Sequence, residues 1–204
     1  FDTRITGTEP VSVLEVSSIP PLNLEQRLSY LLDYPHGCAE QITSQAFPQL
    51  ALSWLLALSP AQQITAENNV REVINRLRSY QTPEGGFAYW PGEPYISEWV
   101  TSYAVNFLAN AQKQGYAVPI QMLQHATNYM RQVANSWNRT EPWSQQDQAY
   151  RLYVLALAGK PDLAAMNRLK ETRLQRPVSQ WLLASAYALS NQQEIATKMI
   201  RDLS

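Results

Sequence analysis

The residues with the greatest chemical potential lie together at 34–41, in the run Tyr-Pro-His-Gly-Cys-Ala-Glu-Gln. Cys38 follows a turn that contains Pro35 and Gly37, and it begins a predicted helix. Its sulfur is therefore expected near the unpaired N–H groups of the first turn, where the pKa of a thiol falls and the thiolate is favoured. Gln41 lies three residues further on, so its side-chain carbonyl can fold back towards the sulfur.

Composition alone favours a simpler role for Cys38. Free cysteine is among the most buried residue types, and a single cysteine in a helical protein is more often a packing residue than a reactive one. Cys38 is the only cysteine, so the sequence excludes an internal disulfide framework and a cysteine-rich zinc site. The two histidines are too few for a convincing metal cluster.

The residues around Cys38 change this balance. Gly37-Cys38-Ala39-Glu40-Gln41 resembles the Gly-Cys-x-Glu-Gln motif of the thioester-containing proteins, the alpha-2-macroglobulin and complement family. The longer run from Tyr34-Pro35 through this motif to Ser44, Phe47-Pro48 and Leu50 is similar to the bacterial branch. The resemblance implies that the Cys38 thiol and the Gln41 side chain condense, with loss of ammonia, into an internal thioester.

The same resemblance assigns roles to these atoms. Gln41 would supply the acyl carbon and Cys38 the activated leaving group, and an amine or hydroxyl of the target would attack and become covalently bound. No cofactor and no metal is implied. Because the bond is consumed in one turnover, the family resemblance implies a covalent protease inhibitor and not a turnover enzyme.

Three further residues are expected to support the bond. Gly37 would provide a backbone geometry that a Cβ forbids, and Glu40 would hydrogen-bond locally or act as a first-turn acid that favours the helix dipole. Tyr34 is expected either to shield the sulfur from water or to pack at the helix end, and the sequence leaves both open.

The histidines are weaker candidates. Some family members use a downstream histidine as nucleophilic catalyst, but His125 lies on a helix predicted to face outward, and His36 is predicted to be an exposed turn residue. If no histidine acts, the thioester should prefer amines to hydroxyls.

Length and charge exclude several other classes. The chain has 204 residues, enough for one compact domain or a domain with an appendage. Sixteen Lys and Arg residues against 17 Asp and Glu residues leave no basic excess for nucleic acid. The longest apolar stretches are far shorter than the roughly 20 residues that a bilayer crossing needs.

Apolar spacing and helix breakers predict an all-α fold after a short extended segment. Residues 1–20 alternate like a strand or linker from a preceding β domain, and 21–204 form the helical domain. Helices are expected from residue 22 to the turn at 34–37, and then at 38–58, 61–81, 97–114, 119–137, 144–158, 162–174, 177–190 and 192–203. Pro48 is expected to kink or break the first of these later helices. The tryptophans at helix starts are expected to fill the core.

Two kinds of helix alternate along the chain. Those at 149–158 and 181–189 are apolar nearly all round, whereas those at 61–81 and 119–137 have broad polar faces. This alternation predicts an α/α toroid with inner and outer helices. Gly85-Gly86-Phe87, Glu98-Trp99-Val100-Thr101 and Asp147-Gln148-Ala149-Tyr150 resemble the family's thioester domain, which is such a toroid. The family domain runs longer, so final helices are expected to be lacking here.

The resemblance implies a periplasmic bacterial protein anchored to the inner membrane. Its expected partners are target proteases, other domains of the parent chain and a peptidoglycan-synthesising penicillin-binding protein. Two alternatives remain open: a non-catalytic interaction module with an inert Cys38, and an α/α-barrel enzyme of the terpenoid cyclase or polysaccharide lyase type. Asp147 and Glu98, near helix starts, are expected to be first-turn acids and not a catalytic pair.

Overall fold

The computed structural model describes residues 37–137 and 144–201, and these form a chain of helices. The predicted extended segment at 1–20 and the predicted helix that ends before the turn at 34–37 lie outside the described residues. The helices are α2 (Ala39–Ala46), α3 (Leu52–Leu55), α4 (Pro60–Leu77), α5 (Glu98–Lys113), α6 (Ile120–Ser136), α7 (Ser144–Leu157), α8 (Leu163–Lys170), α9 (Pro177–Leu189) and α10 (Gln193–Arg201). Two short 3-10 helices are also present: Pro48–Leu50 lies between α2 and α3, and Arg78–Tyr80 follows α4.

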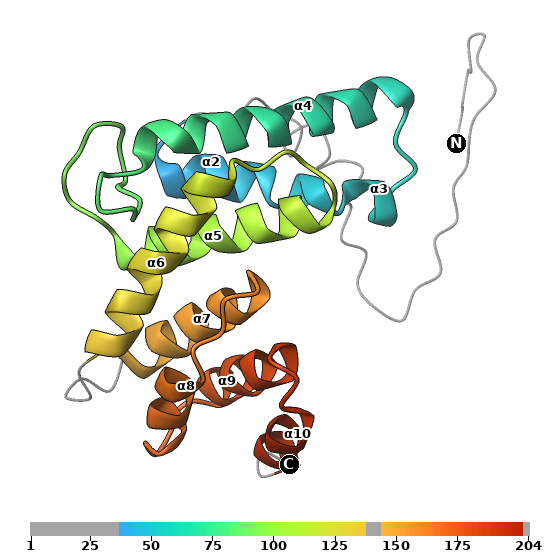
Figure 1. The fold of residues 1–204 in the computed structure, drawn as a ribbon. Helices are drawn as coiled ribbons and strands as arrows, with labels where there is room; N and C mark the ends of the chain where they lie inside the picture. Colours follow the sequence, from blue (N-terminus) through green and yellow to red (C-terminus); the bar gives the residue numbers. More distant parts are fainter. Residues whose placement is uncertain (1–36, 138–143, 202–204) are drawn as a thin grey trace, which may run out of the picture.

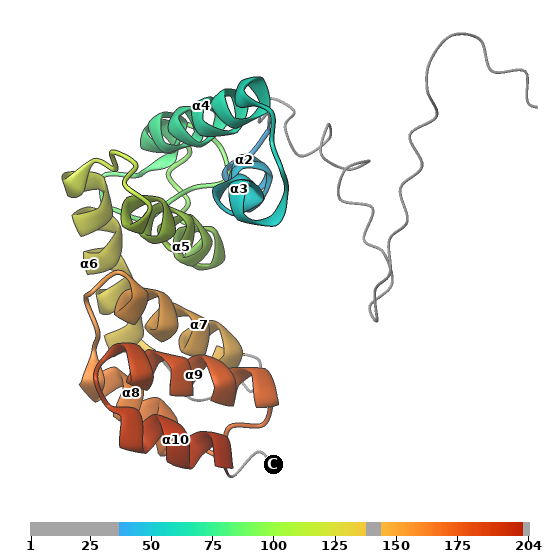
Figure 2. The same ribbon diagram turned by 90° about the vertical axis from the view of Figure 1, so that its right-hand side faces the viewer.

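The helices follow one another along an arc in two layers. Helices α2, α5, α7 and α9 contact one another in succession and make the inner layer. Helix α4 packs on α2 and α5, α6 on α5 and α7, α8 on α7 and α9, and α10 on α9 (Figures 1 and 2). The predicted all-α toroid of alternating inner and outer helices is confirmed.

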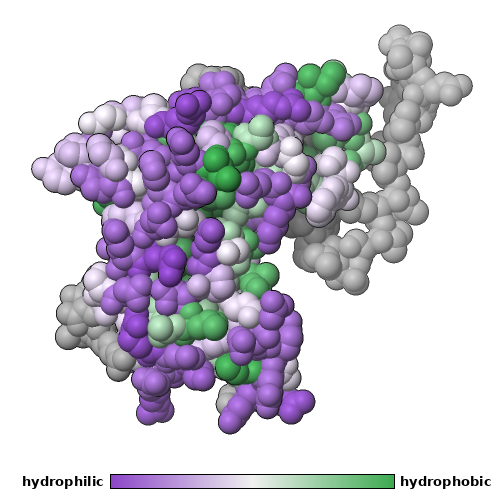
Figure 3. Space-filling view, viewed as in Figure 1, coloured by the Kyte–Doolittle hydropathy of each residue, from purple (hydrophilic) through white to green (hydrophobic). Residues whose placement is uncertain are grey.

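The two layers differ in the way their side chains are buried. In α7 the fully buried Leu152, Val154 and Leu155 point to several sides, as expected for a helix covered by neighbours all round. In α4 the buried residues Val70, Val73, Ile74 and Leu77 follow the i, i+3, i+4, i+7 spacing of a single face. Polar side chains cover most of the face seen in Figure 3, where apolar residues form separate small groups. Within the described ranges, no helix is both long and apolar enough to span a bilayer.

The helix expected at 38–58 breaks at Pro48, one of the two outcomes predicted there, because proline has no N–H to donate and its ring clashes with the preceding turn. Two other details of the predicted fold need correction. The helix expected at 162–174 ends at Lys170. Trp90, Trp99 and Trp181 are about half exposed and so are not core fillers: Trp90 lies in the loop before α5, Trp99 in the first turn of α5, and Trp181 on an exposed side of α9. Trp143 lies outside the described residues.

Asp162 gives the fold a measurable pH dependence. Its carboxylate caps α8 by accepting from the Ala165 N–H at 3.0 Å, and it also accepts from the Asn135 side chain. Burial alone would raise the pKa of Asp162, but these hydrogen bonds and the nearby Arg131 and Arg168 lower it overall. A lowered pKa in the folded state adds stability above the unfolded-state value of about 3.9, and this is lost as the pH falls through the folded-state pKa.

We therefore expect Asp162→Asn, which can still cap the helix, to be less stable than the wild type at pH 7. The difference should shrink below about pH 4, where the wild-type carboxylate is also being protonated. Urea unfolding at several pH values measures this. An equal difference at pH 7 and at pH 3 would show that the charge contributes nothing.

Candidate functional site

Cys38 and Gln41 meet in the first turn of α2. Cys38 is the N-cap residue, with φ −71° and ψ 170°, and forms a capping box with Gln41. In this box the Gln41 side-chain oxygen Oε1 accepts from the Cys38 N–H at 3.0 Å, and the Cys38 side chain faces the Gln41 N–H. The structure therefore brings the thiol-bearing residue and the glutamine carbonyl together.

Gly37 makes room for this arrangement. Its φ of +116° lies in the region that residues with a side chain rarely adopt. A Cβ at Gly37 would lie 2.1 Å from Oε1 of Gln41 and 2.9 Å from its Cδ. Any larger residue here would therefore have to displace the Gln41 side chain from the Cys38 N–H.

The two partners differ in exposure. Cys38 is 9% exposed, whereas Gln41 is exposed on the surface of α2. Glu40 is half-buried and is the acidic residue of the first turn, where negative charge favours the helix dipole. A reagent from solution can thus approach the Gln41 side chain while the cysteine remains largely covered.

Two contacts from a distant loop hold the turn. The Tyr80 hydroxyl donates to the Gly37 carbonyl at 2.8 Å, and the Ala39 N–H donates to the Tyr89 carbonyl at 2.9 Å. Tyr80 is buried at 3% exposure. Both contacts come from the segment that connects α4 to α5, so this segment determines where the first turn of α2 lies.

The segment that connects α4 to α5 is held in place by buried contacts and hydrogen bonds of its own. Phe87 is fully buried, its N–H donates to Thr101 Oγ1 at 2.8 Å, and its carbonyl accepts from the Ser97 N–H. Gly85 and Gly86 precede it in tight contacts, since a Cβ on Gly85 would lie 2.5 Å from the His125 carbonyl oxygen. The sequence run that resembles the family turn is therefore the support for the Cys38 turn.

Replacing Tyr80 by phenylalanine tests the support of this turn. The variant keeps the buried ring but leaves the Gly37 carbonyl without its hydroxyl donor. We expect a loss of about 1 kcal/mol in the free energy of unfolding, measured by urea denaturation. Tyr95→Phe is the matched control, because Tyr95 is 82% exposed in the same segment and should be neutral. Equal stability of the two variants would contradict the role given to Tyr80.

A row of aromatic rings continues from α2 across the inner helices. Phe47 contacts Tyr103, Trp99 stacks on Tyr103 at 5.8 Å between ring centroids, and Trp99 also meets Tyr150. Burial raises the pKa of Tyr150 to about 12, so its hydroxyl stays protonated at neutral pH and cannot act as a general base. The row packs the inner helices beside the site.

The acidic residues near the helix starts have structural roles. Glu98 and Asp147 lie in the first turns of α5 and α7, as predicted. Glu98 pairs with Arg151, whose side chain is 3% exposed. Neither acid forms a paired carboxylate site, and among the residues that the structure describes no group of histidine, cysteine and acidic side chains could hold a metal.

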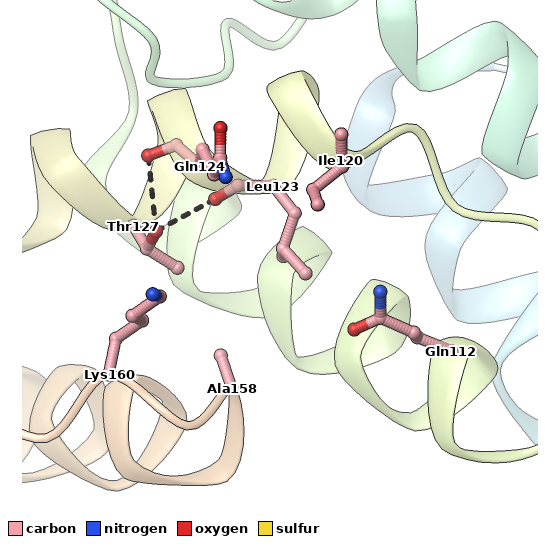
Figure 4. Close-up of a pocket in the computed structure, with 7 residues that line it drawn as sticks. All are labelled: Gln112, Ile120, Leu123, Gln124, Thr127, Ala158 and Lys160. Carbon is pink, nitrogen blue, oxygen red and sulfur yellow. Dashed lines mark hydrogen bonds between the residues drawn. The ribbon is translucent and has the colours of Figure 1, made fainter.

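A small cavity lies away from Cys38, between the end of α5, the first half of α6 and the segment after α7 (Figure 4). Its volume is about 160 Å³, below the roughly 300–1,000 Å³ of typical ligand pockets. Its lining contains no carboxylate; it consists of Gln112, Ile120, Leu123, Gln124, Thr127, Ala158 and Lys160. The cavity gives no support to an α/α-barrel enzyme.

Of the two histidines and the expected shield, only His125 lies within the described residues. His125 is exposed on the outer helix α6, as predicted. His36 and Tyr34 lie outside the described residues. Sequence reasoning missed Tyr80 and the Tyr89 carbonyl as supports; the only signal was that Tyr89 belongs to the run Gly-Gly-Phe-Ala-Tyr-Trp, which carried the family resemblance.

Comparisons with known proteins identify the family of this chain. The profile of the A-macroglobulin TED domain matches residues 12–136. Alpha-2-macroglobulin of Escherichia coli K12 is 30% identical over 172 residues, covering 78% of this chain and 10% of the relative. The chain spans about a tenth of the length of the curated relatives that it matches.

Two solved structures are similar to this chain in both fold and sequence. Salmonella alpha-2-macroglobulin reacted with methylamine has a TM-score of 0.74 and 27% identity, covering 90% of this chain and 13% of that one. Escherichia coli alpha-2-macroglobulin activated by porcine elastase has a TM-score of 0.70 and 26% identity, covering 82% and 16%. From its first-turn geometry, its toroid and these matches, the chain belongs to the alpha-2-macroglobulin family of bacteria and is its TED domain.

Proposed function

We propose that Cys38 and Gln41 form an internal thioester, which couples covalently to an attacking protease after the parent protein is cleaved. The observation that carries this proposal is the placement of the Gln41 carbonyl on the Cys38 N–H, within one helical turn of the sulfur. Such a thioester would be the reactive centre of a single-turnover inhibitor, with no cofactor.

The chemistry is suited to amine capture. A thiolate is a far better leaving group than the ammonia of the parent amide, so the acyl carbon of Gln41 becomes reactive towards a lysine amine. The exposure of Gln41 supports approach from solution, and the position of Cys38 at the start of α2 favours negative charge on the departing sulfur. Among the described residues, His125 is the only histidine and lies on an outer helix, which supports a preference for amines over hydroxyls.

Two similar proteins support the same proposal. The Salmonella relative was crystallised after reaction with methylamine, a small amine, and the Escherichia coli relative was activated by porcine elastase. We propose that this chain also reacts with amines, and that it couples covalently to proteases of the same broad kind. Its triggering would depend on other domains of the parent chain.

Incubation with a protease tests coupling. The whole parent protein, treated with elastase and then boiled in denaturant, should give a covalent adduct on a gel that contains protease and TED-domain peptides. Pretreatment with methylamine should abolish the adduct while leaving cleavage of the parent intact. Cleavage without an adduct would favour the interaction module with an inert Cys38.

The cellular setting is a further proposal that rests on family membership. We propose a periplasmic parent protein, anchored to the inner membrane and close to a peptidoglycan-synthesising penicillin-binding protein. Cell fractionation followed by in-cell cross-linking tests both parts. Recovery in the cytosolic fraction would contradict the location, and absence of a penicillin-binding protein among the cross-linked neighbours would contradict the partner.

A further inference from the structure

We propose that the main-chain N–H of Cys38 is the oxyanion donor for the Gln41 acyl group, and that Gly37 and Tyr80 are the positioning residues that aim it. This inference rests on the proposed thioester and adds the group that lowers the barrier to making and breaking it. The donor belongs to the peptide unit between Gly37 and Cys38, and each atom of that unit able to form a hydrogen bond has a defined partner.

The Cys38 N–H already lies on the oxygen that would take the charge. It donates to Gln41 Oε1 at 3.0 Å, so the donor is in place before Cδ is attacked. The neighbouring Ala39 N–H is already occupied by the Tyr89 carbonyl, so it is directed away from Gln41. The Cys38 N–H is therefore the donor that the structure gives to this carbonyl oxygen.

Formation and capture both pass through an intermediate with negative charge on Oε1 of Gln41. In formation, the Cys38 sulfur attacks Gln41 Cδ, the carbonyl electrons move onto Oε1, and the Cδ–N bond then breaks to release ammonia, which carries away the thiol proton. In capture, an amine nitrogen bonds to the same carbon and Oε1 again takes the negative charge; the C–S bond then breaks to leave an amide, and a proton lost by the amine returns the sulfur to the Cys38 thiol. Both steps place charge on the oxygen that faces the Cys38 N–H.

Gly37 controls the direction from which Oε1 reaches the donor. Because a Cβ on Gly37 would lie 2.1 Å from Oε1, the absence of a side chain at this position is what lets the oxygen reach the donor. Gly92 offers a matched comparison, since its φ is also positive, at +78°, but a Cβ there would meet nothing within 4 Å.

Tyr80 increases the strength of the Cys38 N–H as a donor. The carbonyl of the same peptide unit, on Gly37, accepts from the buried Tyr80 hydroxyl at 2.8 Å. A hydrogen bond to a peptide carbonyl polarises that unit and makes its N–H a stronger donor. Tyr80 thus acts on the Gln41 oxygen through one peptide unit without touching it, and it also fixes the plane in which the N–H points.

The experiment uses the purified protein with Gln41 labelled by carbon-13 at Cδ. Isotope-edited infrared spectra of the folded proteins should show the thioester carbonyl band at lower frequency in the wild type than in Tyr80→Phe, because a stronger N–H donor weakens the C=O bond more. Methylamine should also react more slowly with Tyr80→Phe. Tyr95→Phe should match the wild type in both measurements.

Gly37→Ala and Gly92→Ala supply the second arm, read out by intact mass and thiol titration. We expect formation of the thioester to slow by about 10²–10³-fold in Gly37→Ala, as for loss of one oxyanion donor, and to remain normal in Gly92→Ala. If Tyr80→Phe leaves the carbonyl band in place and Gly37→Ala forms the thioester at the wild-type rate, the oxyanion donor is overturned and the proposed function is left intact. A wild type with no ammonia loss overturns both.

Discussion

Replacing Cys38 by alanine is expected to abolish every covalent property of the chain. Without the sulfur no thioester forms, so the protein should keep its full sequence mass, fail to incorporate methylamine and form no boiling-resistant adduct with a protease. The loss should be complete because no other cysteine is present to substitute for it. Intact mass and a denaturing gel measure all three properties.

Ser44→Ala is the matched control for this variant. Ser44 lies near the other end of α2, is exposed, and donates a hydrogen bond of 3.2 Å to the Tyr103 hydroxyl. It should retain the thioester and the adduct. Methylamine incorporation by Cys38→Ala would contradict the assignment of Cys38, and its loss in Ser44→Ala would point to a general effect on α2.

The second large effect is expected for Phe87→Ala, in the segment that supports the Cys38 turn. Phe87 is fully buried, so truncating it leaves a cavity and should cost about 3–5 kcal/mol in the free energy of unfolding. Because the Tyr89 carbonyl that holds Ala39 lies two residues further on, the same change should reduce the fraction of molecules that carry a thioester.

Tyr95→Ala provides the comparison within the same segment. Tyr95 is 82% exposed, and its truncation should change the free energy of unfolding by no more than about 0.5 kcal/mol. Urea unfolding gives the stabilities, and intact mass gives the thioester fraction. If Phe87→Ala loses stability but keeps a full thioester, the connecting segment supports the fold alone and not the Cys38 turn.

The parts of this site that could be predicted from the sequence are local. Cys38 and Gln41 are three residues apart, so helical geometry alone brings them into one turn once the helix start is recognised from Pro35 and Gly37. The alternation of apolar and amphipathic helices likewise follows from residue spacing, and it predicted the inner and outer layers of the toroid.

The remaining parts depend on contacts between distant residues. Tyr80 lies 43 positions beyond Gly37 in the chain, and its hydroxyl could have been assigned to the Gly37 carbonyl only with the fold in hand. The contact of Tyr89 with Ala39 uses a backbone carbonyl, which leaves no mark in residue type. Trp99 was expected in the core because large aromatics are usually buried, but its contacts with Tyr103 and Tyr150 place it in a half-exposed row.

The most direct test of the central claim is the mass of the freshly purified wild-type protein, with and without methylamine. The account predicts a mass one ammonia below the sequence mass. Methylamine should then add to Gln41 and release one titratable thiol at Cys38. If the untreated whole parent protein instead has its full sequence mass and its Cys38 thiol titrates freely, the thioester is contradicted and the interaction module is favoured.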